Sequence, residues 1–473
     1  MQNSKSMMAV TAFLILLPVF IFFNVPYINN DAIVIITFII NAILFSGGIL
    51  FELKKYSFSL NLMYWIFMYF FMFLAPFIQY TNNKYPWEFF AHPTEDEIFI
   101  NNILIIIFSL MWILGGRIKV NKQKKKTNKV ESYLTTEFIP KYNKKYLILL
   151  IISGVLASYA LLKFGLRGII SSRAESSNKF YSGNNQSIDL IIGIVFPAVL
   201  TYAAIMYFVA WKREKKHFVE MLICMASLVI CFFPTTVARY KAATIYIALL
   251  IVIWPKMRKG STFFWVLLGG LFFIFPFLNL FRYSSDMTLS NFFINLKDNF
   301  IISYTEGHYD AYESLIIATR YIKIEGCTYG RQLMGAILFF IPRGIWPSKS
   351  IGSGAFLAEY FSPGSFSNIS CTFSAECLIN GGWLGFVFLP LLFGFLFTKI
   401  DFVYHNKKDE RAFGVSPYIL LTPLIFFVLR GDLMSSFSYT FGFMLTGFFI
   451  KIFIANDKKR TTSPCFIPIK NIK

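Results

Sequence analysis

The chain has 473 residues, of which 56% are hydrophobic and 19% aromatic, while only 15% carry a charged side chain. Soluble domains usually hold roughly 45–50% apolar and about 25% charged residues. Too few polar side chains remain to cover this much apolar surface, which excludes a soluble globular protein. The formal net charge of +20 suits either nucleic acid or a membrane surface, and its distribution decides between them.

Twelve apolar segments predict an all-α, polytopic membrane protein with about twelve transmembrane helices. A helix needs roughly 17–25 mainly apolar residues to cross a bilayer. The first segment has only Lys5 before it and no small-residue cleavage site, so we expect a retained helix. The seventh and eighth segments form the least regular pair, because Pro234 and two nearby cations leave a very short hairpin. The predicted spans are about 7–23, 32–51, 60–79, 98–115, 146–165, 188–211, 218–234, 242–255, 261–281, 375–398, 413–429 and 437–455.

The loops on the two sides of the membrane differ in net charge. The loops on one side, with the two termini, hold 30 basic and 9 acidic residues, a net charge of +21. The loops on the other side hold 15 basic and 16 acidic residues, a net charge of −1. Basic residues stay on the cytoplasmic face during insertion, so we expect both termini in the cytoplasm. The run KQKKK at 122–126 is then interpreted as an anchor on anionic lipid, and no nucleic-acid partner is expected.

One long outer loop interrupts the regular spacing of the spans. We divide the chain into an N-terminal membrane bundle (1–281), this periplasmic loop (282–374), and three spans with a cytoplasmic tail (375–473). Loops beyond about 12–15 residues are usually functional or disordered. The segments 291–303 and 310–323 are amphipathic at helical spacing, so we expect short helices lying in the membrane interface.

Residues 339–354 of this loop read FFIPRGIWPSKSIGSG. The two prolines fix their own backbone and extend the residues before them, so they hold Arg343 on a rigid loop. A guanidinium held in this way suits phosphate oxygens, and Lys349 adds a second cation. Alternatively, Trp346 anchors the loop at the interface and Arg343 contacts lipid headgroups. Both interpretations stay open.

Three stretches share a recognisable pattern: GHYDAYESL at 307–315, YGRQLMGAILFFIPRGIWPSKSIGSG at 329–354, and NISCTFSAECLINGGWLG at 368–385. This series resembles the Wzy-type oligosaccharide repeat-unit polymerases, which make bacterial O-antigen and capsular polysaccharides. The resemblance is specific over about 300–390, above all in the Pro-Arg-x-x-Trp-Pro-x-Lys core. Elsewhere it rests on hydropathy and the number of spans. Residues 377–382 (CLINGG) depart from the aromatic-Asn-Phe-Gly run of relatives.

The resemblance implies a metal-independent glycosyltransferase with a helical, GT-C-like fold in the bacterial inner membrane. Its substrate would be an undecaprenyl-diphosphate-linked oligosaccharide. The growing glycan is transferred to the non-reducing end of a new lipid-linked repeat at the outer face. Membrane lipid and a chain-length regulator in the membrane are further implied partners. The sugar arrives activated by its lipid, so no cofactor is expected, and the sequence has no Gly-rich nucleotide loop.

Such a transfer needs a base for the acceptor hydroxyl. The candidates, in order, are Glu376, Asp310 and His308. Glu376 begins an apolar span, where a lone carboxylate is costly and therefore has a purpose. His308 has a more common alternative, a loop histidine whose ring is satisfied by hydrogen bonds.

The transfer also needs cations at the leaving diphosphate. Each candidate alone is also explained as an end charge that reaches the membrane interface, but together they would form a diphosphate cradle. No set of His, Cys, Asp and Glu has a metal-binding spacing, so we expect no metal. Besides Arg343, the candidate cations are Arg167, Arg239, Arg282, Lys349 and Arg430.

Two other functions remain as alternatives. A ligase would move a finished glycan to a different acceptor by the same chemistry. A flippase or secondary transporter would show internal repeats with broken spans at matching positions. The sequence shows no such repeats, and the long outer loop would break a symmetry between the two halves of the chain.

The topology can be tested with reporter fusions. Fusions after Arg258 and near Ser350 should report opposite sides of the membrane, because the charge asymmetry places only the first in the cytoplasm. Compartment-specific reporters that place both fusions on one side would refute the predicted map.

Overall fold

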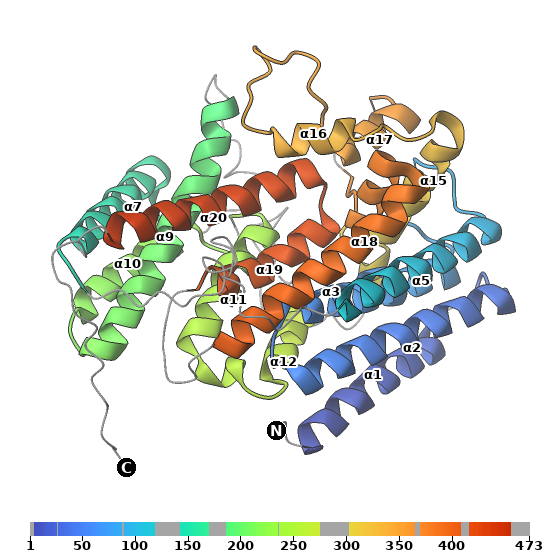
Figure 1. Ribbon diagram of the computed structural model, residues 1–473, viewed down its shortest axis with the longest axis horizontal. Coiled ribbons are helices and arrows are strands. Elements are labelled where there is room, and N and C mark those ends of the chain that lie inside the picture. Colours follow the sequence, from blue (N-terminus) through green and yellow to red (C-terminus); the bar gives the residue numbers. More distant parts are fainter. Residues whose placement is uncertain are drawn as a thin grey trace.

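The structure is a computed structural model that describes residues 4–25, 27–87, 89–118, 142–169, 186–234, 236–274, 302–364, 369–407 and 416–455. Within these residues the regular elements are all helices, with no strand (Figure 1). This confirms the predicted all-α class. Of the sites predicted from sequence, Arg282 lies outside the described residues, and nothing is described of the Arg167 side chain.

The helices follow one another through the whole described chain. In the first half they are α1 (Ser4–Asn24), α2 (Ala32–Lys55), α3 (Leu60–Tyr69), the π turn η1 (Phe70–Leu74), α4 (Ala75–Thr81), α5 (Glu95–Arg117), α7 (Lys145–Ile169), α9 (Gln186–Glu214), α10 (Phe218–Cys231) and α11 (Arg239–Ile253). In the second half they are η2 (Pro255–Arg258), α12 (Thr262–Gly269), η3 (Gly270–Ile274), η4 (Ile302–Thr305), α15 (Ala311–Glu325), α16 (Arg331–Ile337), α17 (Ser353–Phe361), α18 (Phe373–Lys407), α19 (Pro417–Arg430) and α20 (Leu433–Ala455).

Eight of the described helical runs are long and apolar enough to cross a membrane, as expected of a multi-pass membrane protein. They are α1, α2, the run from α3 to α4, α5, α7, α9, α18 and α20. Each of the twelve predicted segments overlaps a helix within the described residues, but the helices of the other four are shorter. The 14 residues of α19 rise about 21 Å, less than the roughly 30 Å of a bilayer's hydrocarbon core. Twelve complete spans therefore stay a prediction.

The run from α3 to α4 forms the centre of the molecule, and every residue from 60 to 81 is buried. Its neighbours include α2, α18 and α19. The π turn η1 interrupts it halfway, and π turns are frequent at functional sites. One ring of this turn, Phe71, stacks on Tyr309 of the outer loop at 5.1 Å between centroids.

Glycines bring α5 and α18 into backbone contact. A Cβ on Gly394 would collide with the backbone oxygen of Trp112, and one on Gly115 with that of Leu391. Small residues allow such close approach between membrane helices, where dispersion contacts provide much of the attraction. The α5–α18 pair is therefore a closely packed unit against which the outer elements rest.

Gly382 breaks α18 near its start, with φ at +58°, a conformation that favours glycine. The break separates the backbone oxygens of Ile379 and Asn380 from their usual helical donors. Those oxygens instead accept hydrogen bonds from the amides of Thr328 and Gly330, both at 2.8 Å. The kink thus docks the connection between α15 and α16 onto α18.

A buried carboxylate binds the N-terminal end of the run from α3 to α4. Asp401 of α18 accepts from the backbone amides of Leu60 and Asn61 at 2.9 and 3.1 Å, and from the Tyr418 hydroxyl at 2.6 Å. It thereby caps the N-terminus of α3 from a distant part of the chain. By the predicted topology this cap lies on the cytoplasmic side.

The helix expected at 310–323 is present as α15, and it is packed inside the protein. It is buried against α5 and α18, and Ala311 to Thr319 are all shielded. The polar residues of this helix do not form a face exposed to water. Glu313 accepts a hydrogen bond from the Trp87 amide, and Ser314 donates one to the Ala311 backbone oxygen. The other predicted helix, 291–303, lies outside the described residues except for its end in η4.

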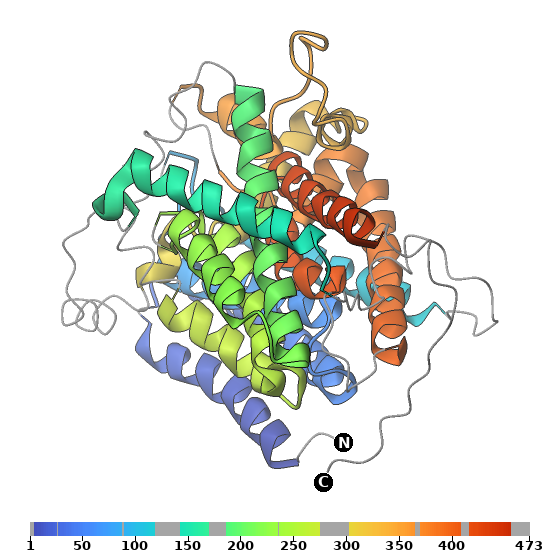
Figure 2. The same cartoon turned by 90° about the vertical axis from the view of Figure 1, so that its left-hand side faces the viewer.

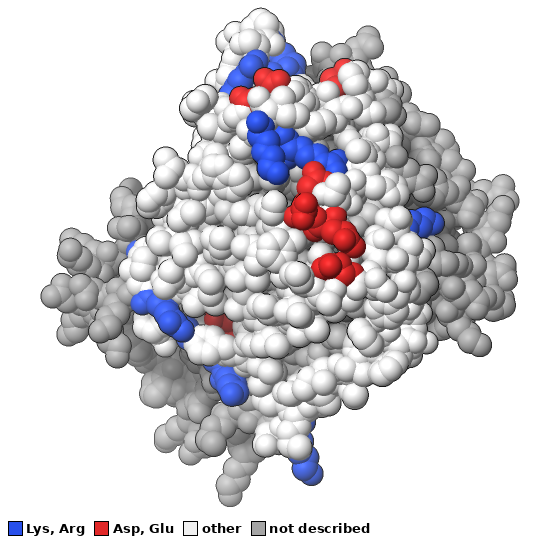
Figure 3. Space-filling model, turned by 90° about the vertical axis from the view of Figure 1, so that its right-hand side faces the viewer, with Lys and Arg blue, Asp and Glu red and all other residues white. Residues whose placement is uncertain are grey.

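The outside of the bundle is mostly apolar. On α2 the side chains of Ile36, Ile40 and Ile43 are exposed while Phe38 and Phe45 are buried, so this helix is apolar on both faces. Figure 3 shows that most of one face carries no Lys, Arg, Asp or Glu. On another side, α7, α9 and α10 pack together, and α9 joins them to α20 (Figure 2).

Gly394→Ala tests the backbone contact between α5 and α18. The added methyl has no space, so overpacking should lower the free energy of unfolding by about 1–3 kcal/mol. Gly154→Ala in α7 is the matched control, because a Cβ there meets nothing within 4 Å. Thermal unfolding of both variants in detergent measures the difference, and equal melting temperatures would contradict the contact.

Candidate functional site

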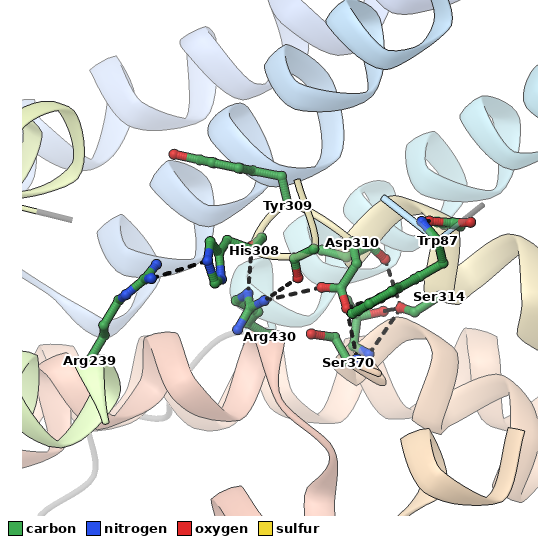
Figure 4. A network of polar contacts seen from close by, with 12 residues as sticks. Trp87, Arg239, His308, Tyr309, Asp310, Ser314, Ser370 and Arg430 are labelled. Atoms are coloured by element: carbon green, nitrogen blue, oxygen red, sulfur yellow. Dashed lines mark hydrogen bonds and ion pairs between the residues drawn. The ribbon is translucent and has the colours of Figure 1, made fainter. Parts of the chain in front are cut away.

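Two arginines, from helices that are far apart in the sequence, contact residues 307–310, the GHYD segment just before α15 (Figure 4). Arg430 ends α19, and its Nε donates to the backbone oxygen of His308 at 3.0 Å. Arg239 begins α11, and its Nη2 lies 3.1 Å from Nε2 of His308. Because α11 and α19 pack on each other, their two arginine ends reach the same segment.

Asp310 fixes the position of Arg430. Its Oδ1 lies 3.1 Å from Nη2 of Arg430, and its Oδ2 accepts from Trp87 Nε1 at 3.1 Å and the Ser370 amide at 2.9 Å. The residue is 1% exposed. A buried charge is tolerated when it is paired and hydrogen-bonded, and here three donors from three parts of the chain provide that.

The contact between Arg239 and His308 defines the state of the imidazole. A guanidinium has only donors, so Nε2 of His308 must accept the hydrogen bond. The ring is then neutral, with its proton on Nδ1. In this arrangement Nε2 has no free lone pair for a substrate proton.

The GHYD segment is anchored on the central helix. Gln79 of α4 donates to the backbone oxygens of Tyr304 and Tyr309 at 2.8 and 2.9 Å. A Cβ on Gly307 would lie 2.8 Å from the Trp87 ring, so this position requires glycine or a shift of the indole. These contacts hold the backbone that carries His308 and Asp310.

Two guanidinium groups gather on the GHYD segment. Burial and the neighbouring Asp310 carboxylate raise the pKa of Glu313 well above its ordinary value, which favours the neutral form of this carboxyl. Arg239 and Arg430 bring two positive charges to the same short segment. Such an arrangement suits a bound anion.

Glu376, the first-ranked base, lies outside this group. Its Oε2 accepts from Ser353 at 2.8 Å and Asn380 at 3.0 Å, and its Oε1 accepts from the Leu433 amide at 2.8 Å. It is 1% exposed. These contacts tie α17 and the start of α20 to α18, so in this structure Glu376 acts as a cross-link.

Arg343 and Lys349 are also apart from the site, on the loop that projects between α16 and α17 (Figure 1). The guanidinium of Arg343 donates to the backbone oxygens of Lys349 and Ser350 at 2.7 and 3.0 Å. Lys349 Nζ donates to those of Phe339 and Ile341 at 2.6 and 3.1 Å. In this structure the two cations of the loop bind its own backbone, and its rigidity stays a prediction.

Sequence reasoning missed several residues that build the site. Gln79 is a lone amide in an apolar run, and a polar residue in such a segment signals a buried role. Trp87 lies in a short connection between two apolar segments, where no sequence motif marks it. Ser370 contributes only its backbone amide, which no side-chain pattern can indicate.

Comparison of the chain with protein-family models, with curated proteins and with solved structures finds no match. Among the described residues, no three His, Cys, Asp or Glu side chains come together as a metal site requires. The site is therefore interpreted from its own contacts.

Asp310→Ala should be strongly destabilising, because it leaves the Arg430 charge and two buried donors without their acceptor. Breaking one partner of a buried ion pair costs about 3–5 kcal/mol. The double variant Asp310→Ala/Arg430→Leu should recover part of this loss, since the unpaired charge is removed as well. The free energy of unfolding, measured for Asp310→Ala, Arg430→Leu and the double variant, gives a double-mutant cycle. If the losses of the two single variants simply add up in the double variant, the coupling between Asp310 and Arg430 is contradicted.

Proposed function

We propose that this chain is a polymerase of undecaprenyl-diphosphate-linked oligosaccharide repeat units, acting at the outer face of the bacterial inner membrane in O-antigen or capsule synthesis. The observation that supports this most is the meeting of Arg239 and Arg430 on the GHYD segment. That segment is one of the three stretches that resemble Wzy-type polymerases. The third stretch contacts this segment through the Ser370 amide, and the second stretch pairs with the third through the backbone of 328–330.

In the proposed reaction, an acceptor sugar hydroxyl attacks the anomeric carbon of the growing glycan. The bond from that carbon to the diphosphate oxygen breaks, and its electron pair stays on the diphosphate. The guanidinium groups of Arg239 and Arg430 stabilise this developing charge through charge-assisted hydrogen bonds. Asp310 acts as a positioning residue, because it holds Arg430 through the ion pair.

His308 is the base that this geometry favours. Both oxygens of Asp310 and of Glu376 already accept hydrogen bonds inside the protein. When Arg239 turns to the diphosphate, it leaves Nε2 of His308, and that lone pair then accepts the hydroxyl proton. Substrate binding would thereby switch on the base. Arg343 can join the cradle only after leaving the carbonyl oxygens of Lys349 and Ser350.

The proposal is tested with purified protein in nanodiscs supplied with one defined lipid-linked repeat unit. Arg239→Ala should lower the polymerisation rate by about 10²–10³-fold, the usual effect of losing one preorganised donor. Arg430→Lys keeps a charge for Asp310 but loses the planar fork, so we expect a smaller loss. Lys323→Ala is the matched control, since this exposed cation lies on α15 outside the cluster.

A ladder of glycan lengths on a gel measures the outcome, with melting temperatures recorded alongside. Wild-type polymer from Arg239→Ala would remove this arginine from the site. A wild-type protein that transfers the glycan to a different acceptor, and never lengthens it, would favour the ligase alternative instead.

A further inference from the structure

The element formed by α16 and the loop 338–350, here called the α16 flap, lies along the side of a candidate membrane span. The ring of Phe339 contacts that of Phe441 in α20, at 6.1 Å between centroids. Phe441 lies eight residues after the start of α20, which corresponds to about 12 Å of helix rise. The flap therefore does not stand beyond the end of α20 but covers part of its flank.

The flap also exposes large apolar side chains. Ile345 is 78% exposed and Phe340 is 65% exposed. Phe441, which contacts Phe339, is 44% exposed on a helix apolar enough to cross a membrane. Exposed apolar side chains of this kind mark a contact surface, and the packing of α16 on α20 puts this surface beside a candidate membrane span.

Part of the polar backbone of the loop finds its partners within the protein. Irregular backbone in an apolar medium has to find its hydrogen bonds in this way. Arg343 and Lys349 together cover four backbone oxygens of the loop. The two prolines, at 342 and 347, have no amide to satisfy. The two cations therefore lower the cost of placing both ends of this loop beside hydrocarbon.

A groove of about 450 Å³ opens between α16 and the loop. Its volume falls in the range of ligand pockets, roughly 300–1,000 Å³. Five of its six lining residues are apolar and the sixth is an arginine: Met334, Leu338, Ile341, Ile345, Trp346 and Arg331. A long apolar wall with one exposed cation is complementary to a hydrocarbon chain that carries an anionic group.

We propose that this groove binds an acyl chain of an anionic phospholipid from the outer leaflet, with the lipid phosphate at Arg331. The α16 flap is then a lipid-docking element at the rim of the membrane bundle. This assignment does not depend on the catalytic proposal, because its residues are separate from Arg239, His308 and Arg430.

The test uses the full chain in nanodiscs of phosphatidylglycerol and phosphatidylcholine, without any lipid-linked sugar. A photoreactive residue, p-benzoylphenylalanine, replaces Ile345 in the groove. In the control protein it replaces Tyr329, which is 92% exposed but does not line the groove. Illumination followed by intact-protein mass spectrometry should detect a lipid adduct at position 345 and little at 329.

The phosphatidylglycerol share of the adducts should exceed its share of the nanodisc by about fivefold, the effect expected of one cation near an anionic lipid. Arg331→Glu should abolish this enrichment while adducts with phosphatidylcholine persist. Equal adduct yields at both positions, or enrichment that survives Arg331→Glu, would overturn the proposal. Adding undecaprenyl phosphate provides a further check, because its preferential cross-linking would assign the groove to an isoprenoid chain instead.

Discussion

The buried ion pair between Asp310 and Arg430 joins parts of the molecule that are far apart in the sequence. Through Asp310 it also binds Trp87, in the connection before α5, and Ser370, just before α18. A carboxylate that is 1% exposed would be costly without these donors. Each partner therefore depends on the others, and together with Gln79 they hold the GHYD segment against the central helix.

The membrane class and several candidate site residues could be predicted from the sequence, because both follow from local patterns. Each of the twelve apolar segments overlaps a helix within the described residues, and Arg239 and Arg430 each stand near the end of such a segment. Their pairing could not be predicted. It depends on α11 packing against α19 and on a backbone amide at Ser370, and neither has a signature in the local sequence.

The failures have a shared physical cause. The polar residues of α15 suggested a helix on the membrane surface, yet hydrogen bonds inside the protein allow Glu313 and Ser314 to be buried. The prolines around Arg343 predicted a rigid loop that would hold its guanidinium for a ligand. The sequence could not show that the guanidinium is already bound to backbone oxygens in that loop. In each case a polar side chain was assigned to solvent or ligand when the protein itself is its partner.

The π turn η1 has a consequence for the register of the central helix. A π turn accommodates one more residue than an α turn, and each residue of an α-helix rotates the chain by about 100°. Without η1, α4 would be rotated by that angle relative to α3. Gln79 would then point away from the Tyr304 and Tyr309 oxygens that it now binds. The extra residue in the π turn at 70–74 thus decides which face of the central helix carries Gln79 toward the GHYD segment. Deletion of one residue in this turn would remove the support that Gln79 gives to that segment.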